Sequence, residues 1–161
     1  MVVILVEADV SDEWDSSTDW PALAERAVCA AIAHSAFPAL ADTEVSVKFT
    51  SDGEVRALNA AWRRRDKATN VLSFPMADAP EGAPMLGDIV LAAGVCAREA
   101  AEKQVAAATH ATHLVVHGAL HLLGYDHETS DGDAEAMEEI ERKALASLGI
   151  ADPYHVSEVE L

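Results

Sequence analysis

The stretch VSVKFTSDGEVRALNAAW, Val45–Trp62, contains a strand pattern followed directly by a helix pattern. Its first half alternates between apolar and polar residues, and this period of two is typical of a strand with one buried face. The apolar residues of the alternation are Val45, Val47 and Phe49. Ser51-x-x-Glu54 then matches a capping box, which marks a helix start. Apolar residues at helical spacing follow at Val55, Leu58 and Trp62. The stretch therefore predicts a half-buried strand connected directly to an amphipathic helix.

Similar patterns on both sides of this stretch predict the remaining elements. Short apolar runs indicate strands, and apolar residues that recur every three or four positions indicate helices. The further strands are expected at Val2–Val6, Asn70–Phe74 and Gly87–Leu91, with a loop over Met76–Met85 between the last two. The further helices are expected from about Pro21, over Ala93–Leu123 with a break at Val105–Thr109, and ahead of Gly149. Gly124 supplies the glycine that commonly ends a helix.

The last predicted helix has an apolar side and many acidic residues. Its apolar side consists of Met137, Ile140, Ala144 and Leu148. Because acidic side chains are rarely buried, we expect its glutamates to form the solvated face. These are Glu135, Glu138, Glu139 and Glu141.

The predicted order is strand, helix, strand, helix, strand, strand and then helices. This order is not a regular βαβ array, and no glycine-rich phosphate loop follows a strand, so dinucleotide and P-loop chemistry have no support. Layer rules favour an α+β fold with a single mixed sheet of about four strands, packed with about five helices. A length of 161 residues is typical of one domain, and we expect a single domain over residues 1–161.

The composition and charge restrict the classes of partner. No apolar run approaches the ~20 residues of a membrane span, and the start of the chain lacks the basic residues of a signal peptide. We therefore expect a cytoplasmic protein that does not contact a membrane. Cys29 and Cys96 share no metal-type spacing and are expected to be small buried residues.

The formal net charge of −17 at pH 7 argues against broad, non-specific attraction to nucleic acid, and we expect no DNA partner. A local basic run is the exception. It consists of Arg63, Arg64, Arg65 and Lys67. Such a run on an acidic body can contact a phosphate, although a charge run that is merely solvated is the alternative.

The segment HGALHLLGYDH, His117–His127, predicts a metal site. His117 and His121 are four residues apart in a predicted helix, so both rings project from one face. After the turn at Gly124, His127 can return to the same point as a third ligand. Three imidazoles with one open position are typical of catalytic zinc, although imidazole also suits nickel, copper and iron.

Other residues near this segment limit the chemistry. His110 and His113 lie upstream on the same predicted helix, and we expect both to be structural or to support the ligands from behind. Zinc proteases of the HExxH type carry a glutamate directly after the first histidine, whereas Gly118 occupies that position here. Asp126 could act as a base, but it is interpreted as a turn residue or as a carboxylate that orients an imidazole.

The same segment resembles the H-x3-H-x5-H signature of the YbeY family of bacterial rRNA maturation factors. LNAAWRRRDKATNVLSFP, Leu58–Pro75, and LGDI, Leu86–Ile89, resemble two further segments of that family. The resemblance covers about Val45 to Tyr154. This chain departs from the family pattern at Arg64, where a glycine is common.

The resemblance implies a metal-dependent, single-strand-specific endoribonuclease that acts in 16S rRNA 3′-end maturation and ribosome quality control. It implies one zinc ion on His117, His121 and His127, a functionally important Arg63, and catalytic roles for Arg63, His117 and His121. Single-stranded rRNA and the small ribosomal subunit or its associated proteins are the partners it implies. Arg64, Arg65 and Lys67 would then contact backbone phosphates. Two alternatives are a ribosome-associated assembly factor whose metal is mainly structural and a zinc hydrolase of amide substrates.

Overall fold

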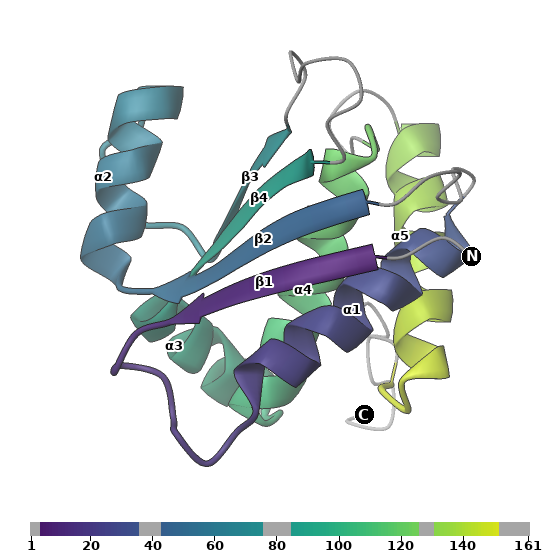
Figure 1. Cartoon of the computed structure of the whole chain (residues 1–161), viewed down its shortest axis with the longest axis horizontal. Helices are drawn as coiled ribbons and strands as arrows, with labels where there is room; N and C mark the ends of the chain where they lie inside the picture. The colour runs from purple at the N-terminus through teal and green to yellow at the C-terminus, as the bar shows by residue number, and fades with distance from the viewer. Residues whose placement is uncertain (1–3, 36–42, 76–84, 126–130, 152–161) are drawn as a thin grey trace, which may run out of the picture.

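The computed structural model describes residues 4–35, 43–75, 85–125 and 131–151, which contain one four-stranded mixed sheet and five helices (Figure 1). The strands lie in the order β1-β2-β4-β3. Neighbours among β1, β2 and β4 are parallel, and β3 is antiparallel to β4. The strands are β1 (Ile4–Val10), β2 (Thr43–Thr50), β3 (Val71–Pro75) and β4 (Met85–Ala92). The helices are α1 (Trp20–His34), α2 (Asp52–Arg63), α3 (Ala93–Lys103), α4 (Ala107–Leu122) and α5 (Asp131–Ser147). The predicted α+β fold and the predicted order of elements are confirmed.

Local signals explain several of these boundaries. The Ser51 hydroxyl accepts a hydrogen bond of 3.1 Å from the backbone N–H of Glu54, so the predicted cap forms at the start of α2. In a full capping box the glutamate side chain would bond back to the N-cap residue. The Glu54 carboxylate instead forms an ion pair with Lys48 of β2, 2.8 Å away. The helix break expected at Val105–Thr109 lies slightly earlier, at residues 104–106, and Gly124 follows α4 with a φ of 102°.

The two faces of the sheet carry separate cores. Alternate side chains of each strand point to opposite faces, and the larger core joins one face to α1, α4 and α5. Its buried strand residues are Val45, Val47, Phe49, Ile89 and Leu91. The smaller core lies where α2 packs on β3 and β4, and it consists of Val55, Leu72, Val90 and Ala92, with Leu58, Phe74 and Val95 packed against it. Helix α2 therefore lies on the face of the sheet opposite α1, α4 and α5 (Figure 1).

Strand β3 lies at an edge of the sheet, between α2 on one face and α4 on the other. This placement leaves the outer side of β3 beside the C-terminal ends of both helices. The fold thus brings the basic run at the end of α2 and the histidines of α4 to the same edge.

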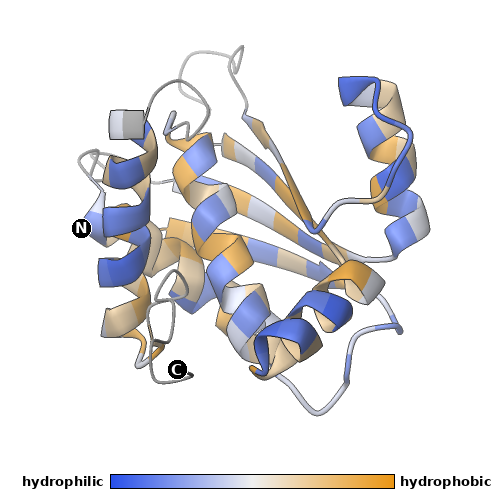
Figure 2. Cartoon of the chain, turned by 180° about the vertical axis from the view of Figure 1, so that it is seen from behind, coloured by the Kyte–Doolittle hydropathy of each residue, from blue (hydrophilic) through white to orange (hydrophobic). Residues whose placement is uncertain are grey.

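The predicted solvated face of α5 is wrong at one position. Glu141 has 0% exposure, as do Met137, Ala144 and Leu145 on the same helix. Figure 2 shows the hydrophilic residues of α5 mostly on its outward side. Glu141 lies inside the buried stripe because residues three or four positions apart share a helix face. The sequence pattern missed it because a carboxylate at such a position is ordinarily excluded from a core.

Parts of the predicted elements lie outside the described residues. These are Val2 and Val3, the loop residues 76–84, and Asp126 and His127. Among the helices in the described ranges, none combines the length and the hydropathy that crossing a bilayer would require.

Candidate functional site

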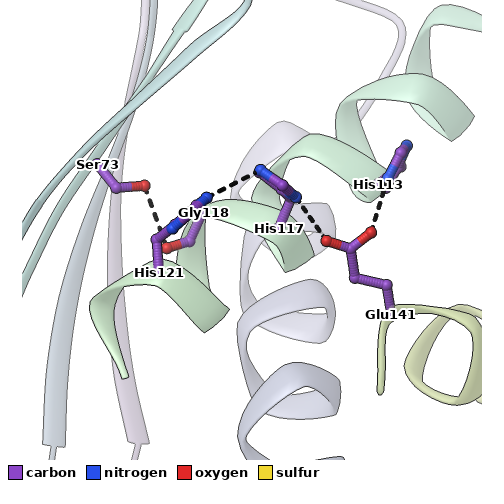
Figure 3. A network of polar contacts seen from close by, with 6 residues as sticks. All are labelled: Ser73, His113, His117, Gly118, His121 and Glu141. Carbon is purple, nitrogen blue, oxygen red and sulfur yellow. Dashed lines mark hydrogen bonds and ion pairs between the residues drawn. The ribbon is translucent and has the colours of Figure 1, made fainter. Parts of the chain in front are cut away.

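His117 and His121 come together on the last turns of α4, as their spacing predicts. Their Nε2 atoms are 3.0 Å apart, and the ring centroids are 4.6 Å apart (Figure 3). Two nitrogen ligands at 2.0–2.1 Å from a tetrahedral zinc ion would be separated by about 3.3 Å. The two imidazoles therefore already converge at nearly the spacing that a shared ion requires.

The backbone of α4 approaches the sheet closely at Gly118. The Ser73 hydroxyl donates a hydrogen bond of 3.1 Å to the Gly118 carbonyl. A Cβ atom at residue 118 would lie 2.9 Å from Ile89 Cγ2 and 3.0 Å from Ser73 Oγ. Real Cβ atoms almost never approach other atoms this closely, so Gly118 is a packing requirement. The glutamate of an HExxH protease has no room here without a shift of the helix.

A cavity of about 850 Å³ lies along the outer edge of β3. His117 and His121 contribute to its wall from α4, and the last residue of α2 and the loop after it contribute three cations from the other side. These cations are Arg63, Arg65 and Lys67. The cavity therefore places two imidazoles and three positive side chains around one space.

Arg63 is held against β3. One guanidinium nitrogen donates a hydrogen bond of 2.6 Å to the Ser73 carbonyl, and the guanidinium carbon lies 5.6 Å from the centre of the Phe74 ring. Arg64 does not line the cavity, in contrast to its neighbours. It ends α2 in the left-handed conformation, with φ 57° and ψ 34°. That conformation favours glycine, so the chain keeps a glycine-like turn although an arginine stands there.

The basic loop is fixed by side chains that the sequence did not single out. Asn59 is buried, and its side-chain amide donates a hydrogen bond of 2.9 Å to the Lys67 carbonyl. The backbone carbonyl of Asn59 accepts a hydrogen bond of 3.2 Å from the Arg65 N–H. Arg56 forms two hydrogen bonds with the Asp66 carboxylate, at 2.7 and 3.2 Å. Asp66, the acidic residue within the loop, therefore pairs with Arg56 and not with the cations that line the cavity.

Glu141 is the site residue that the sequence analysis missed. One carboxylate oxygen contacts Nδ1 of His117 at 2.5 Å, and the other contacts Nε2 of His113 at 3.2 Å (Figure 3). The contact joins α5 to α4 across 24 residues of sequence. A helical stripe of Met137, Glu141 and Ala144 was the available signal, because it places the glutamate among apolar residues.

His113 and His110 both lie away from the cavity lining. His110 contacts Glu99 on α3 at 2.8 Å, and Glu99 also accepts a hydrogen bond of 3.0 Å from Asn70 at the start of β3. Burial lowers the pKa of His110, although Glu99 opposes that shift. Burial alone would raise the pKa of Glu99, but the hydrogen bonds from His110 and Asn70 bring it below its ordinary value.

The predicted third ligand, His127, lies outside the described residues, as does Asp126. Within the described ranges, no set of three histidine, cysteine or acidic side chains is arranged to hold a metal ion. The donor chemistry nevertheless fits a transition metal, since two imidazole nitrogens converge beside a cavity and one ring is supported by a carboxylate from behind.

Comparisons with known proteins identify relatives over nearly the whole chain. The sequence model of the family described as Endoribonuclease YbeY matches residues 8–149. A protein of Novosphingobium aromaticivorans named endoribonuclease YbeY is 55% identical, with 96% of this chain and 98% of the relative covered. A protein of Rhizorhabdus wittichii with the same name is 52% identical, with 98% and 99% covered.

A solved structure shows the same fold at much lower sequence similarity. The solution structure of TM1509 from Thermotoga maritima is 23% identical and has a TM-score of 0.55, with 96% of this chain and all of that chain covered. Because the family model and both relatives extend over nearly the whole chain, this protein belongs to the endoribonuclease YbeY family.

Proposed function

We propose that this protein is a cytoplasmic, metal-dependent endoribonuclease that cleaves single-stranded rRNA during 16S rRNA 3′-end maturation and ribosome quality control. The observation that carries the proposal is the cavity beside β3, where His117 and His121 face three cationic side chains. The names of the relatives supply the substrate class. The small ribosomal subunit or its associated proteins are the proposed macromolecular partners.

His117, His121 and His127 would hold one zinc ion in this proposal. When bound, such an ion supplies a Lewis acid beside the scissile phosphodiester and lowers the pKa of a water molecule. Three protein ligands leave a position open for catalysis, whereas structural zinc sites are closed by four. The position of the two imidazoles on the wall of an open cavity supports a catalytic ion over a mainly structural one.

Arg63 would stabilise the negative charge that develops on the phosphate in the transition state. Its guanidinium is oriented before substrate binds, since Ser73 and Phe74 hold it at the cavity wall. Arg65 and Lys67 would contact neighbouring backbone phosphates of the RNA. Arg64 does not line the cavity, so its proposed phosphate contact has less support than those of Arg65 and Lys67.

Hydrolysis of amide substrates is disfavoured by the packing of Gly118. The HExxH mechanism needs a glutamate base at that position, and the closeness of Ile89 and Ser73 leaves no room for one. A phosphodiester substrate also explains the three cations, because its negative charge attracts them and a neutral amide has no such charge.

The test compares zinc content and cleavage of single-stranded rRNA fragments among four proteins. We expect Arg63→Glu to keep its zinc and to lose about 10²–10³-fold in cleavage rate, because it removes a preorganised charge. His117→Ala should lose both zinc and cleavage. Arg26→Glu, which makes the same charge change at an exposed position of α1, is the control and should match the native protein. Native-like cleavage by Arg63→Glu with zinc retained would refute the proposed role of Arg63.

A further inference from the structure

The buried carboxylate of Glu141 is the group that the described chemistry leaves without a function. Its side chain has 0% exposure and lies on α5 among apolar residues. Burial of a carboxylate is strongly unfavourable unless hydrogen bonds or charges compensate for it. Both of its oxygens contact histidine rings of α4, those of His113 and His117 (Figure 3).

The direction of these hydrogen bonds decides the state of His117. An ionised carboxylate can only accept hydrogen bonds, so the ring nitrogen that faces it must carry the proton. For His117 this nitrogen is Nδ1. A neutral imidazole has a single N–H, so Nε2 of His117 is left with a lone pair. That Nε2 is the atom 3.0 Å from Nε2 of His121, and both histidines line the cavity.

His113 completes the support from the other side. It lies one helical turn before His117, and its Nε2 contacts the second carboxylate oxygen at 3.2 Å. With both oxygens engaged, the carboxylate cannot rotate without breaking a contact, so the His117 ring is fixed in orientation as well as in tautomer.

We propose that Glu141 is the positioning residue of the metal site, holding His117 as the Nδ1–H tautomer with Nε2 ready to bind a transition-metal cation. This inference rests on the proposed function, since it takes His117 to be a ligand. The carboxylate also places a buried negative charge behind that ligand, and this charge attracts the cation. His113 holds the carboxylate and does not itself reach the ion.

The first measurement uses the native protein without metal. Two-dimensional NMR that correlates imidazole nitrogens with carbon-bound protons reports which ring nitrogen of His117 carries the proton. We expect Nδ1–H for His117. A neutral Nε2–H form would overturn the proposal. This experiment requires no variant and no activity.

The second measurement compares the Zn²⁺ affinities of Glu141→Gln and Glu139→Gln by competition with a chelator. Both variants remove one carboxylate from α5, but Glu139 is exposed and pairs with Arg142, so it serves as the matched control. We expect Glu141→Gln to bind Zn²⁺ about 10- to 100-fold more weakly than Glu139→Gln. A role limited to joining α5 to α4 would lower thermal stability and leave the affinity of the folded chain unchanged, and that outcome would overturn the proposal.

Two further outcomes are informative. If Glu141→Gln does not fold, His113→Asn, which disturbs the same carboxylate from its other side, should show a smaller loss of Zn²⁺ affinity with a changed tautomer balance at His117. If His113→Asn left both the Zn²⁺ affinity and the tautomer balance at His117 unchanged, the proposal would be contradicted. If the native protein binds no Zn²⁺ while His117 is held as Nδ1–H, the proposed metal function fails, whereas the positioning of the ring by Glu141 stands.

Discussion

The substitution Gly118→Ala tests whether close packing of α4 on the sheet sets the shape of the site. A methyl group there would lie 2.9 Å from Ile89 and 3.0 Å from the Ser73 hydroxyl. Gly53 in α2 is the matched control. A Cβ atom at residue 53 has Ser51 Oγ as its nearest neighbour within 4 Å, at 3.9 Å. Both substitutions add the same atom to a helix, but only one adds it to a filled space.

The expected magnitudes follow from two opposing effects. Alanine in place of a helical glycine stabilises the folded state by about 0.5–1 kcal/mol. An extra methyl group in a packed core costs about 1–3 kcal/mol. Gly53→Ala should therefore gain up to about 1 kcal/mol, whereas Gly118→Ala should be neutral or lose up to about 2 kcal/mol. The difference of about 2 kcal/mol corresponds to about 6 °C in Tm for a chain of this size.

Thermal unfolding of the metal-free proteins, followed by circular dichroism, measures this difference directly. The same experiment on Gly118→Glu should show a much larger loss, because a whole side chain must then fit between α4 and the sheet. If Gly118→Ala is stabilised as much as Gly53→Ala, the space at residue 118 is larger than the structure shows. The packing argument against an HExxH base would then fail.

Three other predictions concern regions outside this contact. The Asp52 carboxylate accepts hydrogen bonds of 2.8 and 3.1 Å from the first N–H groups of α3, so Asp52→Ala should lose about 1–2 kcal/mol in urea unfolding. The exposed Asp12→Ala should change little, and equal losses would contradict the capping role. His110 has a lowered pKa in the folded state and takes up a proton more readily when unfolded, so its contribution to stability is present above its ordinary value of 6.5 and falls as the pH drops below it. His110→Gln should flatten the decrease in Tm between pH 7.5 and 5.5, and an unchanged slope would assign that decrease to other groups. Burial raises the pKa of Cys96 to about 12, so its thiol should resist alkylation at pH 8 until the protein unfolds, and rapid labelling of the native protein would disprove this burial.

The sequence by itself determined the elements and their order. Alternation at Val45–Phe49, the cap at Ser51 and the glycine after α4 are local signals, and each acts within one turn of the residue it controls. The spacing of His117 and His121 belongs to the same class, since two residues four apart in a helix share a face whatever the rest of the chain does.

Only the tertiary structure decided which distant groups meet. Ser73 reaches Gly118 across 45 residues, and Glu141 reaches His117 across 24. Neither contact has a local pattern, because both arise from the way α4 is packed between β3 and α5. Glu141 shows this most clearly. From the sequence pattern its carboxylate is expected to be exposed to solvent, but contacts with two imidazoles of another helix compensate for its burial.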